Sequence, residues 1–359
     1  MVTSGWYWFG LGVYFIIILV VGYNASRRTK SVEDFYVAGR TLGPMVLALT
    51  YVATYSSASS WIGVPGLAYR FGWSVFHIFG AGTIGVVLGH LIAAKKLRDA
   101  AERINALTLC DILEKRYNSK LLRAFGAIVI IIGSFFIMVA QFKGVGVVFS
   151  QMFGISFQTS VVVFAVIVAV YLAFGGFFAV AWTDAVQGFI MMAGMLLVGI
   201  TAIVYVGGFG ELNAKLAEIN PEMLNFTGPK QWLWLPAMLG AWGVVGLGAV
   251  SVPYMIVRFI TYKQGPGVLG KSVVLGTIAH AIFSLAVVCG LIAAVVIPGL
   301  KDFDTAMPSL ILKILHPALA AFILAAIVAA VMSTVDSGLI LVGQSFARDI
   351  YQELISSEE

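Results

Sequence analysis

Charged residues are scarce in this sequence. Only 11% of its 359 residues are Asp, Glu, Lys or Arg, whereas 60% are hydrophobic. A soluble domain carries about 25% charged residues, so this chain has too few to cover a water-facing surface. The composition excludes a soluble two-domain protein, the first expectation for this length. It predicts an all-α membrane protein that crosses the bilayer many times.

Paired cysteines, clustered histidines and catalytic motifs are also missing. The two cysteines, Cys110 and Cys289, lie far apart and lack the spacing of a disulfide framework or a metal site. No HExxH, GxSxG or P-loop pattern occurs. We therefore expect neither an enzyme nor a bound cofactor. The four histidines are scattered along the chain: His77, His90, His280 and His316.

No positively charged segment precedes the first hydrophobic run. The run from Trp6 to Tyr23 is instead followed by basic residues and lacks a small-residue cleavage pattern, which is typical of a retained span and not of a signal peptide. The net charge of +5 comes from Lys and Arg placed between hydrophobic runs, so it reports membrane topology and not nucleic-acid binding. We expect a plasma-membrane protein with its N-terminus outside.

Nine hydrophobic runs are long enough to cross a bilayer. With the N-terminus outside and the C-terminus of this chain inside, the cytoplasmic segments hold sixteen Lys and Arg residues, Arg258 among them, and the outer segments hold five. This asymmetry obeys the positive-inside rule. We treat residues 1–359 as one transmembrane domain. The predicted spans are 6–24, 43–69, 73–97, 121–149, 158–179, 184–207, 234–259, 272–297 and 317–345.

Two of these spans are interrupted near their middle. The run 43–69 contains a patch of hydroxyl side chains followed by helix breakers, and the run 234–259 is rich in glycine. Paired breaks in two halves of a chain predict a transporter site at the bilayer midplane. The alternatives are a Ser- and Gly-lined packing face and the general abundance of Gly in membrane helices. The residues are Thr54, Ser56, Ser57, Ser59, Ser60, Gly63, Pro65 and Gly66, and Gly240, Gly243, Gly246, Gly248 and Pro253.

The last span, 317–345, combines small residues with oxygen ligands. Ala326, Ala330, Ser333 and Ser337 form a stripe that allows another helix to approach closely. Thr334 adds a hydroxyl next to Ser333. Asp336 lies roughly 14 Å from the helix end at 1.5 Å per residue, and an acid at that depth indicates a functional site. Oxygen ligands of this kind suit a hard monovalent cation.

Three further polar residues have simpler interpretations. Asp184 begins the span 184–207, where the helix dipole favours a carboxylate, and membership of an inner cation path is the alternative. Lys143 lies near the outer end of its span, so its ammonium group is expected to reach the interface. Gln141 beside it is a weaker candidate for a ligand contact.

The chain resembles the sodium/solute symporter family, which includes bacterial symporters for proline, pantothenate, sialic acid and sugars. The patches ATYSSASSWIGVPG and VPYMIVRFITYK are most similar to the pantothenate branch. Several long motifs occur in the family's order, so the resemblance is specific. They are SVEDFYVAGRTLGP at 31–44, ATYSSASSWIGVPG at 53–66, NALTLCDILEKRY at 105–117, AFGGFFAVAWTDAVQG at 173–188, VRFITYK at 257–263 and AAVMSTVDSGLIL at 329–341.

This resemblance implies a leucine-transporter-type fold, built from a five-plus-five inverted repeat with one extra helix at the N-terminus. Family members continue for several further helices, so the second repeat is incomplete here and holds three of its five helices. The sequence is then a piece of a longer protein or a short form.

The resemblance also assigns residues to sites. The implied sodium site contains Ala53, Ser56, Ser57, Ala330, Ser333 and Thr334. A second cation site, present in some members, maps to Asp184, Asp336 and Ser337. Candidate substrate residues are Ser59, Ser60, Trp61, Gln141 and Trp242. The proline branch has an acidic residue where this chain has Tyr55, which weakens an assignment to proline.

We therefore predict a symporter in which a sodium gradient drives uptake of a small organic solute by alternating access. A carboxylate such as pantothenate is the expected solute. The alternatives are a sodium/proline-type symporter and a membrane sensor or channel on the same fold. The expected partners are the solute, the sodium ion and the lipid bilayer, and no nucleic acid.

Overall fold

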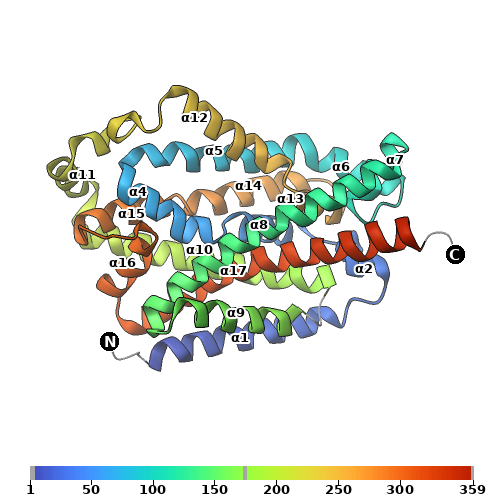
Figure 1. Cartoon of the computed structure of the whole chain (residues 1–359), viewed down its shortest axis with the longest axis horizontal. Helices are drawn as coiled ribbons and strands as arrows, with labels where there is room; N and C mark the ends of the chain where they lie inside the picture. Colours follow the sequence, from blue (N-terminus) through green and yellow to red (C-terminus); the bar gives the residue numbers. More distant parts are fainter. Residues whose placement is uncertain (1–4, 173–175, 357–359) are drawn as a thin grey trace.

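The computed structural model describes residues 5–172 and 176–356. Within these ranges the chain is helical, and its one strand-like contact is a bridge between Leu42 and Tyr262. The long helices run side by side along the longest axis of the molecule (Figure 1). The predicted all-α architecture is confirmed.

Twelve of the larger elements form the first part of the described chain. They are α1 (Gly5–Ser26), α2 (Val32–Val37), α3 (Pro44–Tyr55), η2 (Ser59–Gly63), α4 (Val64–Phe71), α5 (Val75–Leu88), η4 (Gly89–Ala94), α6 (Lys95–Arg103), α7 (Leu109–Tyr117), α8 (Lys120–Phe153), α9 (Phe157–Leu172) and α10 (Gly176–Val206). Short turns of 3-10 helix, η1 (Ala38–Arg40) and η3 (Gly72–Ser74), join some of them.

The second part continues after α10. It contains α11 (Gly208–Ile219), η5 (Pro221–Leu224), η6 (Pro229–Gln231), α12 (Leu235–Ala241), η7 (Trp242–Leu247), η8 (Gly248–Val250), α13 (Pro253–Thr261), α14 (Val268–Ile282), α15 (Leu285–Val296), η9 (Phe303–Thr305), α16 (Ala306–Ile314), α17 (Pro317–Gln344) and η10 (Ser345–Ile355). Of these, η7 and η10 are wider, π-helical segments.

Six helices in the described part are long and apolar enough to cross a membrane. Three shorter apolar helices accompany them, and each of the nine predicted spans overlaps at least one of these nine helices. The six are Gly5–Ser26, Ser59–Arg103, Lys120–Phe153, Gly176–Val206, Val268–Val296 and Pro317–Ile355, and the shorter ones are Pro44–Tyr55, Phe157–Val168 and Leu235–Leu247.

The two parts of the chain repeat one order of elements. In the first, the broken helix α3/η2/α4 is followed by the long helix α5 to α6, the short helix α7 and the long helix α8. In the second, the broken helix α12/η7/η8/α13 is followed by α14 and α15, the short helix α16 and the long helix α17. This order is that of an inverted-repeat transporter.

Helix α17 forms the centre of the molecule. It packs against α1, α3, α8 and α10. Of the hydrophobic stretch that α17 begins, 83% is buried inside the protein, against 22% of the hydrophobic stretch of α1. The predicted stripe of small residues faces these neighbours, since a side chain at Gly194 of α10 would lie 2.7 Å from the Cβ of Ala326. Close approach of this kind is what small residues permit in membrane helices.

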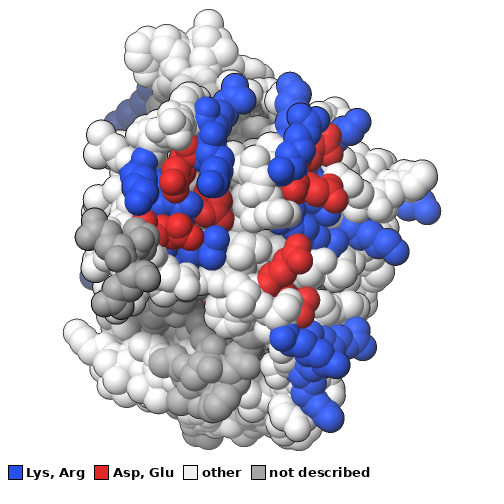
Figure 2. Space-filling model, turned by 90° about the vertical axis from the view of Figure 1, so that its right-hand side faces the viewer, with Lys and Arg blue, Asp and Glu red and all other residues white. Residues whose placement is uncertain are grey.

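One end of the molecule carries α2, α6, α7 and η10, and we call it the basic end. Figure 2 faces this end and shows that Lys and Arg gather on it among fewer Asp and Glu side chains. Helices α2 and α7 both begin there with reciprocal capping boxes, formed by Ser31 with Asp34 and by Thr108 with Asp111, which satisfy the free N–H groups of the first helical turn.

Helix α10 starts earlier than the sequence predicts. Its first residue is Gly176, whose φ of +61° favours glycine, whereas the predicted span begins at 184. Asp184 therefore lies about two turns inside the helix and is fully buried. The interpretation of Asp184 as a carboxylate at a helix start is wrong.

Candidate functional site

The first helix break separates α3 from η2. Helix α3 ends at Tyr55, and Ser56 has a non-helical backbone with φ −85° and ψ +68°. The N–H of Ala58, which the break frees from the helix, donates to the side-chain oxygen of Gln141 on α8 at 2.9 Å. A freed backbone group at membrane depth needs such a partner, so Gln141 supports the break.

The second break separates η8 from α13. Ser251 and Val252 lie between them, and α13 begins with Pro253, a residue that fits the first turn of a helix because its N–H is not needed there. The two broken helices are in contact, since the hydroxyl of Tyr55 donates to the carbonyl of Val245 at 3.0 Å.

Hydroxyls of α17 meet backbone carbonyls of α3 next to the first break. The Ser333 hydroxyl donates to the carbonyls of Ala53 at 3.0 Å and Ala330 at 3.1 Å. The Thr334 hydroxyl donates to the carbonyls of Thr54 at 3.1 Å and Ala330 at 3.2 Å. All of these residues are buried. The two helices thus bring together a compact set of uncharged oxygen atoms.

Behind this junction lies an ion pair at the core of the molecule. The Arg258 guanidinium on α13 donates to Asp184 Oδ2 on α10 at 2.5 Å, and both side chains are 0% exposed. Thr50 donates to the same carboxylate oxygen at 3.0 Å. Arg258 also donates to the hydroxyls of Thr54 and Ser337, so it links α3, α10 and α17.

The close packing of α10 on α3 positions this pair. A side chain at Gly188 would lie 2.8 Å from the carbonyl oxygen of Leu49, and only glycine allows this approach. Asp184, one turn earlier on α10, therefore lies within reach of Thr50 on α3.

Several buried acceptor atoms near this pair have no partner in the described part of the chain. Both carboxylate oxygens of Asp336 and Oδ1 of Asp184 lack a hydrogen bond. The side-chain oxygen of Gln187 also lacks a donor, although its NH₂ group donates to Tyr14. An unpaired acid at this depth is costly, and a bound cation or proton would remove the cost.

A cavity of about 380 Å³ lies on the other side of the first break. It is bounded by the broken helices, by α5 and by α14. Its polar groups are hydroxyls and one imidazole, and no Asp, Glu, Lys or Arg is among its described lining residues. They are Tyr55, Ser57, Ser59, Ser60, Gly63, Val64, Leu67, Ile78, Phe79, Gly82, Val244, Val245, Val252, Tyr254 and His280.

Comparison with known proteins identifies the family. Residues 35–359 match the profile of the sodium:solute symporter family. This chain belongs to that family. It is 33% identical over 352 residues to the sodium/pantothenate symporter of Haemophilus influenzae, covering 95% of this chain and 72% of that protein. It is also 33% identical over 344 residues to the high-affinity proline transporter PutP of Bacillus subtilis, covering 94% and 72%.

A solved structure confirms the fold. A Na⁺-coupled sialic acid symporter in a substrate-bound outward-open state superposes with a TM-score of 0.81 at 21% identity, over 97% of this chain and 75% of that one. The predicted leucine-transporter-type architecture and the predicted family are both confirmed. As a member of the family, the chain is a multi-pass membrane protein.

The residues expected at the sodium site are not all brought together. Ala53, Ala330, Ser333 and Thr334 meet at the α3–α17 junction, as described above. Ser56 is buried beside the break, and its hydroxyl has no partner. The Ser57 hydroxyl instead lies 3.0 Å from that of Ser59 and faces the cavity.

The residues expected at the second cation site lie around the Arg258 pair. Asp184 accepts from Arg258, and Asp336 has the unpartnered oxygens. The Ser337 hydroxyl donates to the Ser333 carbonyl at 2.8 Å, so the two predicted sets adjoin. In the described part of the chain, no three His, Cys, Asp or Glu side chains form a metal-binding cluster.

The five candidate substrate residues are dispersed. Ser59 and Ser60 line the cavity. Trp61 is 0% exposed and packs edge-on against Phe283 in the core. Trp242, on η7, is 38% exposed and is not among the described lining residues, and neither is Gln141.

Sequence reasoning missed Arg258 and three groups of the cavity. Arg258 was assigned to a cytoplasmic segment, which is wrong, because α13 continues to Thr261 and buries it. An arginine within the apolar stretch 253–261 was the available signal. Tyr55, Tyr254 and His280 line the cavity, and His280 also bonds the Thr83 hydroxyl through Nδ1 at 2.9 Å.

The remaining expectation concerns Lys143. Its side chain is 63% exposed, and its ammonium group pairs with Asp304 at 2.6 Å. Such an exposed pair contributes little stability, and it agrees with a side chain that reaches the interface. Asp304 is on η9, directly before α16, which lies at the end of the molecule opposite the basic end (Figure 1).

Proposed function

We propose that this chain is a sodium-coupled symporter that takes up a small organic solute by alternating access. The supporting observation is the junction at which Ser333 and Thr334 of α17 meet the Ala53 and Thr54 carbonyls of α3. In this proposal it lies in the plasma membrane with the N-terminus outside and the basic end in the cytoplasm, as the positive-inside rule requires.

Sodium binds at this junction as a cargo ion. The carbonyls of Ala53, Ser56 and Ala330 and the hydroxyls of Ser333 and Thr334 turn their oxygens toward it. Uncharged oxygens are enough for an ion of single charge. The ion ties α17 to the last turn of α3, so it fixes the helix whose broken end forms a wall of the cavity.

The solute binds in the 380 Å³ cavity. Because Ser57 and Ser59 follow directly after the sodium-binding turn, ordering this turn with sodium also orders part of the solute site. Linkage then requires that sodium and solute raise each other's affinity by the same factor. Release of sodium toward the basic end loosens the junction and reverses the effect.

A second cation occupies the region of Asp184, Asp336 and Ser337. The support is the set of buried carboxylate oxygens that have no partner. A sodium ion or a proton there neutralises Asp336, which no arginine or lysine contacts in the described chain.

The solute class is a monocarboxylate with hydroxyl or amide groups, such as pantothenate. Hydroxyl donors of Tyr55, Ser59 and Ser60 suit a carboxylate and its polar substituents. An amino acid such as proline also carries an ammonium group, and the described cavity has no carboxylate to receive it.

A thermal-shift screen of the purified 359-residue chain tests the proposal. Pantothenate and proline are each titrated in sodium chloride and in potassium chloride, because a ligand that binds the native state raises the melting temperature. We expect pantothenate to raise it in sodium and much less in potassium. Equal shifts in both salts would overturn sodium coupling, and a shift with proline alone would overturn the assigned solute class.

A further inference from the structure

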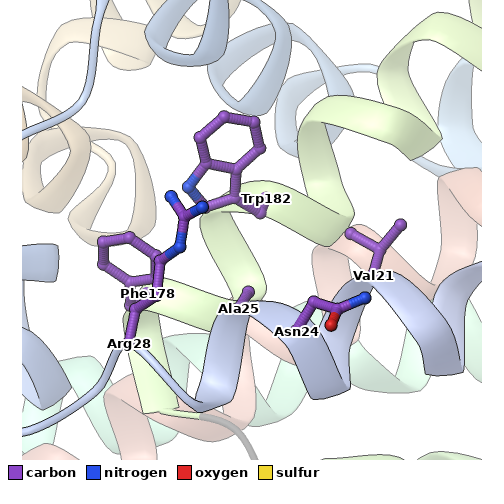
Figure 3. Close-up of a pocket in the computed structure, with 6 residues that line it drawn as sticks. All are labelled: Val21, Asn24, Ala25, Arg28, Phe178 and Trp182. Atoms are coloured by element: carbon purple, nitrogen blue, oxygen red, sulfur yellow. The ribbon is translucent and has the colours of Figure 1, made fainter.

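A second cavity, of about 190 Å³, lies between α1 and α10 close to the basic end. The last turns of α1 and the residue Arg28 beyond it form one wall, and α10 forms the other. Figure 3 shows the Arg28 side chain extending past Phe178 toward Trp182. The lining residues are Val21, Asn24, Ala25, Arg28, Phe178 and Trp182.

We propose that this cavity binds the headgroup of an anionic phospholipid. Its lining combines a guanidinium, a carboxamide and an indole with the apolar side chains of Val21, Ala25 and Phe178. Such a pairing of polar donors with an apolar wall matches the boundary between a lipid phosphate and its acyl chains. Basic pockets between membrane helices bind lipid headgroups in this way.

Arg28 is available for an anion. In the part of the chain that the structure describes, no carboxylate pairs with its guanidinium and none lines the cavity. Arg123 and Arg258, in contrast, are buried and paired with carboxylates. A free guanidinium with two parallel donors matches a phosphate group particularly well.

The cavity lies at the level where α1 leaves the hydrocarbon. The preceding turns of α1 expose Ile16, Leu19 and Val20, a face that fits acyl chains. Arg27 and Arg28 follow directly after the helix, and Trp182 is 38% exposed beside them. Basic and aromatic residues concentrate at the interfacial level of membrane proteins. In the proposed orientation this is the cytoplasmic leaflet.

Size and charge select the lipid. A volume of about 190 Å³ gives room for a phosphate group. Zwitterionic lipids also carry an ammonium group, and no acidic residue lines the cavity to receive it. Phosphatidylglycerol, which has no ammonium group, is therefore favoured over phosphatidylcholine.

A lipid bound in this cavity would contact the same helix that carries Asp184 of the central site. Trp182 precedes Asp184 by two residues on the same helix, so a lipid held against Trp182 contacts the helix that positions the buried ion pair. A bound headgroup thus restrains α10 against α1 at its first turns.

Native mass spectrometry of the purified chain tests the proposal, with phosphatidylglycerol and phosphatidylcholine as separate probes. We expect the first to bind more tightly. Arg28→Gln lowers its affinity about tenfold, as expected for loss of a charge-assisted hydrogen bond. Asn24→Leu fills the cavity without changing the charge and also weakens binding.

Arg27→Gln is the matched control. It removes the same charge one residue away, from a side chain that stacks on Tyr23 and does not line the cavity, so we expect a change of less than about twofold. Equal losses for Arg27→Gln and Arg28→Gln would overturn the proposal in favour of general surface charge. Equal binding of both lipids would also overturn it, as would competition by inorganic phosphate at concentrations equal to those of the lipid.

Discussion

The clusters around two buried arginines, Arg258 and Arg123, differ in how completely their hydrogen-bonding groups are satisfied. At the centre, Arg258 pairs with the single carboxylate of Asp184. At the basic end, Arg123 of α8 pairs with three carboxylates, those of Asp111, Glu114 and Asp349.

In the cluster at the basic end, donors surround the acids. Asp111 accepts from the N–H groups of Leu107 at 2.7 Å and Thr108 at 3.0 Å, and the Thr108 hydroxyl donates to Asp349 at 2.6 Å. At the centre, Asp336 has no hydrogen-bond donor within the described ranges of the chain. A complete network stabilises one arrangement, whereas missing donors leave room for a cation. The cluster at the basic end thus fastens α7 and α8 to η10, and the proposed second cation would complete the cluster at the centre.

The largest expected effect comes from removing the central arginine. Arg258→Met leaves Asp184 and Asp336 buried without a positive charge, so we expect a loss of about 3–5 kcal/mol of stability, measured by thermal or denaturant unfolding. The double variant Arg258→Met with Asp184→Leu removes both charges and is expected to recover most of this loss. A single variant as stable as wild type would contradict a role for the pair in the fold.

The next effect concerns sodium. Ser333→Ala combined with Thr334→Ala removes two hydroxyl ligands, so we expect the sodium half-saturation of the thermal shift to rise at least about tenfold while the fold is kept. Thr277→Ala on α14 is the control, because that hydroxyl bonds only the carbonyl of its own helix. An unchanged sodium half-saturation would refute the site at the α3–α17 junction.

At the basic end we expect a loss of stability without a change in ion dependence. Asp349→Asn keeps the shape of the side chain but removes the charge facing Arg123, which costs about 1–3 kcal/mol. The free energy of unfolding should fall by the same amount in sodium and in potassium. A selective loss in sodium would show that this cluster also belongs to the cation path.

A smaller, opposite effect is expected at Asp336. Asp336→Ser replaces an unpaired buried acid with a hydroxyl, so stability should stay equal or rise. The number of cations linked to solute binding, taken from the slope of log affinity against log sodium concentration, should fall by about one. An unchanged slope, together with an unchanged pH dependence, would exclude a second cation site there.

The smallest effect is a pH dependence at the basic end. Burial alone would raise the pKa of Asp111, but the Leu107 N–H, Arg348 and Arg123 together hold it below its ordinary value. Because this pKa is lowered, the ionised carboxylate stabilises the fold above the unfolded pKa of about 4, and this stabilisation is lost as the pH falls below that value. Asp111→Asn should flatten the fall in melting temperature below pH 4, measured against wild type.

The sequence predicted the fold well because its signals were local. Hydrophobic runs located the helices, and the Ser, Gly and Pro residues near 56 and 253 marked both breaks. The start of α10 was misplaced because the apolar stretch before Asp184 continues the preceding run without a polar boundary.

The site was predicted only in part, because pairing across the chain leaves no local signal. Arg258 and Asp184 are 74 residues apart, and the arginine resembled a positively charged loop residue. Ser59 faces the cavity while Trp61, two positions later on the opposite side of the same helical segment, packs in the core. Helical periodicity predicts that the two side chains point in opposite directions, but not which of them faces the cavity.

The hydrogen bond from Tyr55 to Val245 has a consequence for selectivity. Both residues line the cavity, and the bond joins the two broken helices directly. A solute that accepts a hydrogen bond from Tyr55 in place of Val245 leaves the Val245 carbonyl without its donor. It recovers the lost energy only if it also offers a donor to that carbonyl. The two polar atoms lie only 3.0 Å apart, so a solute that carries an acceptor beside a donor can replace this contact between the two broken helices.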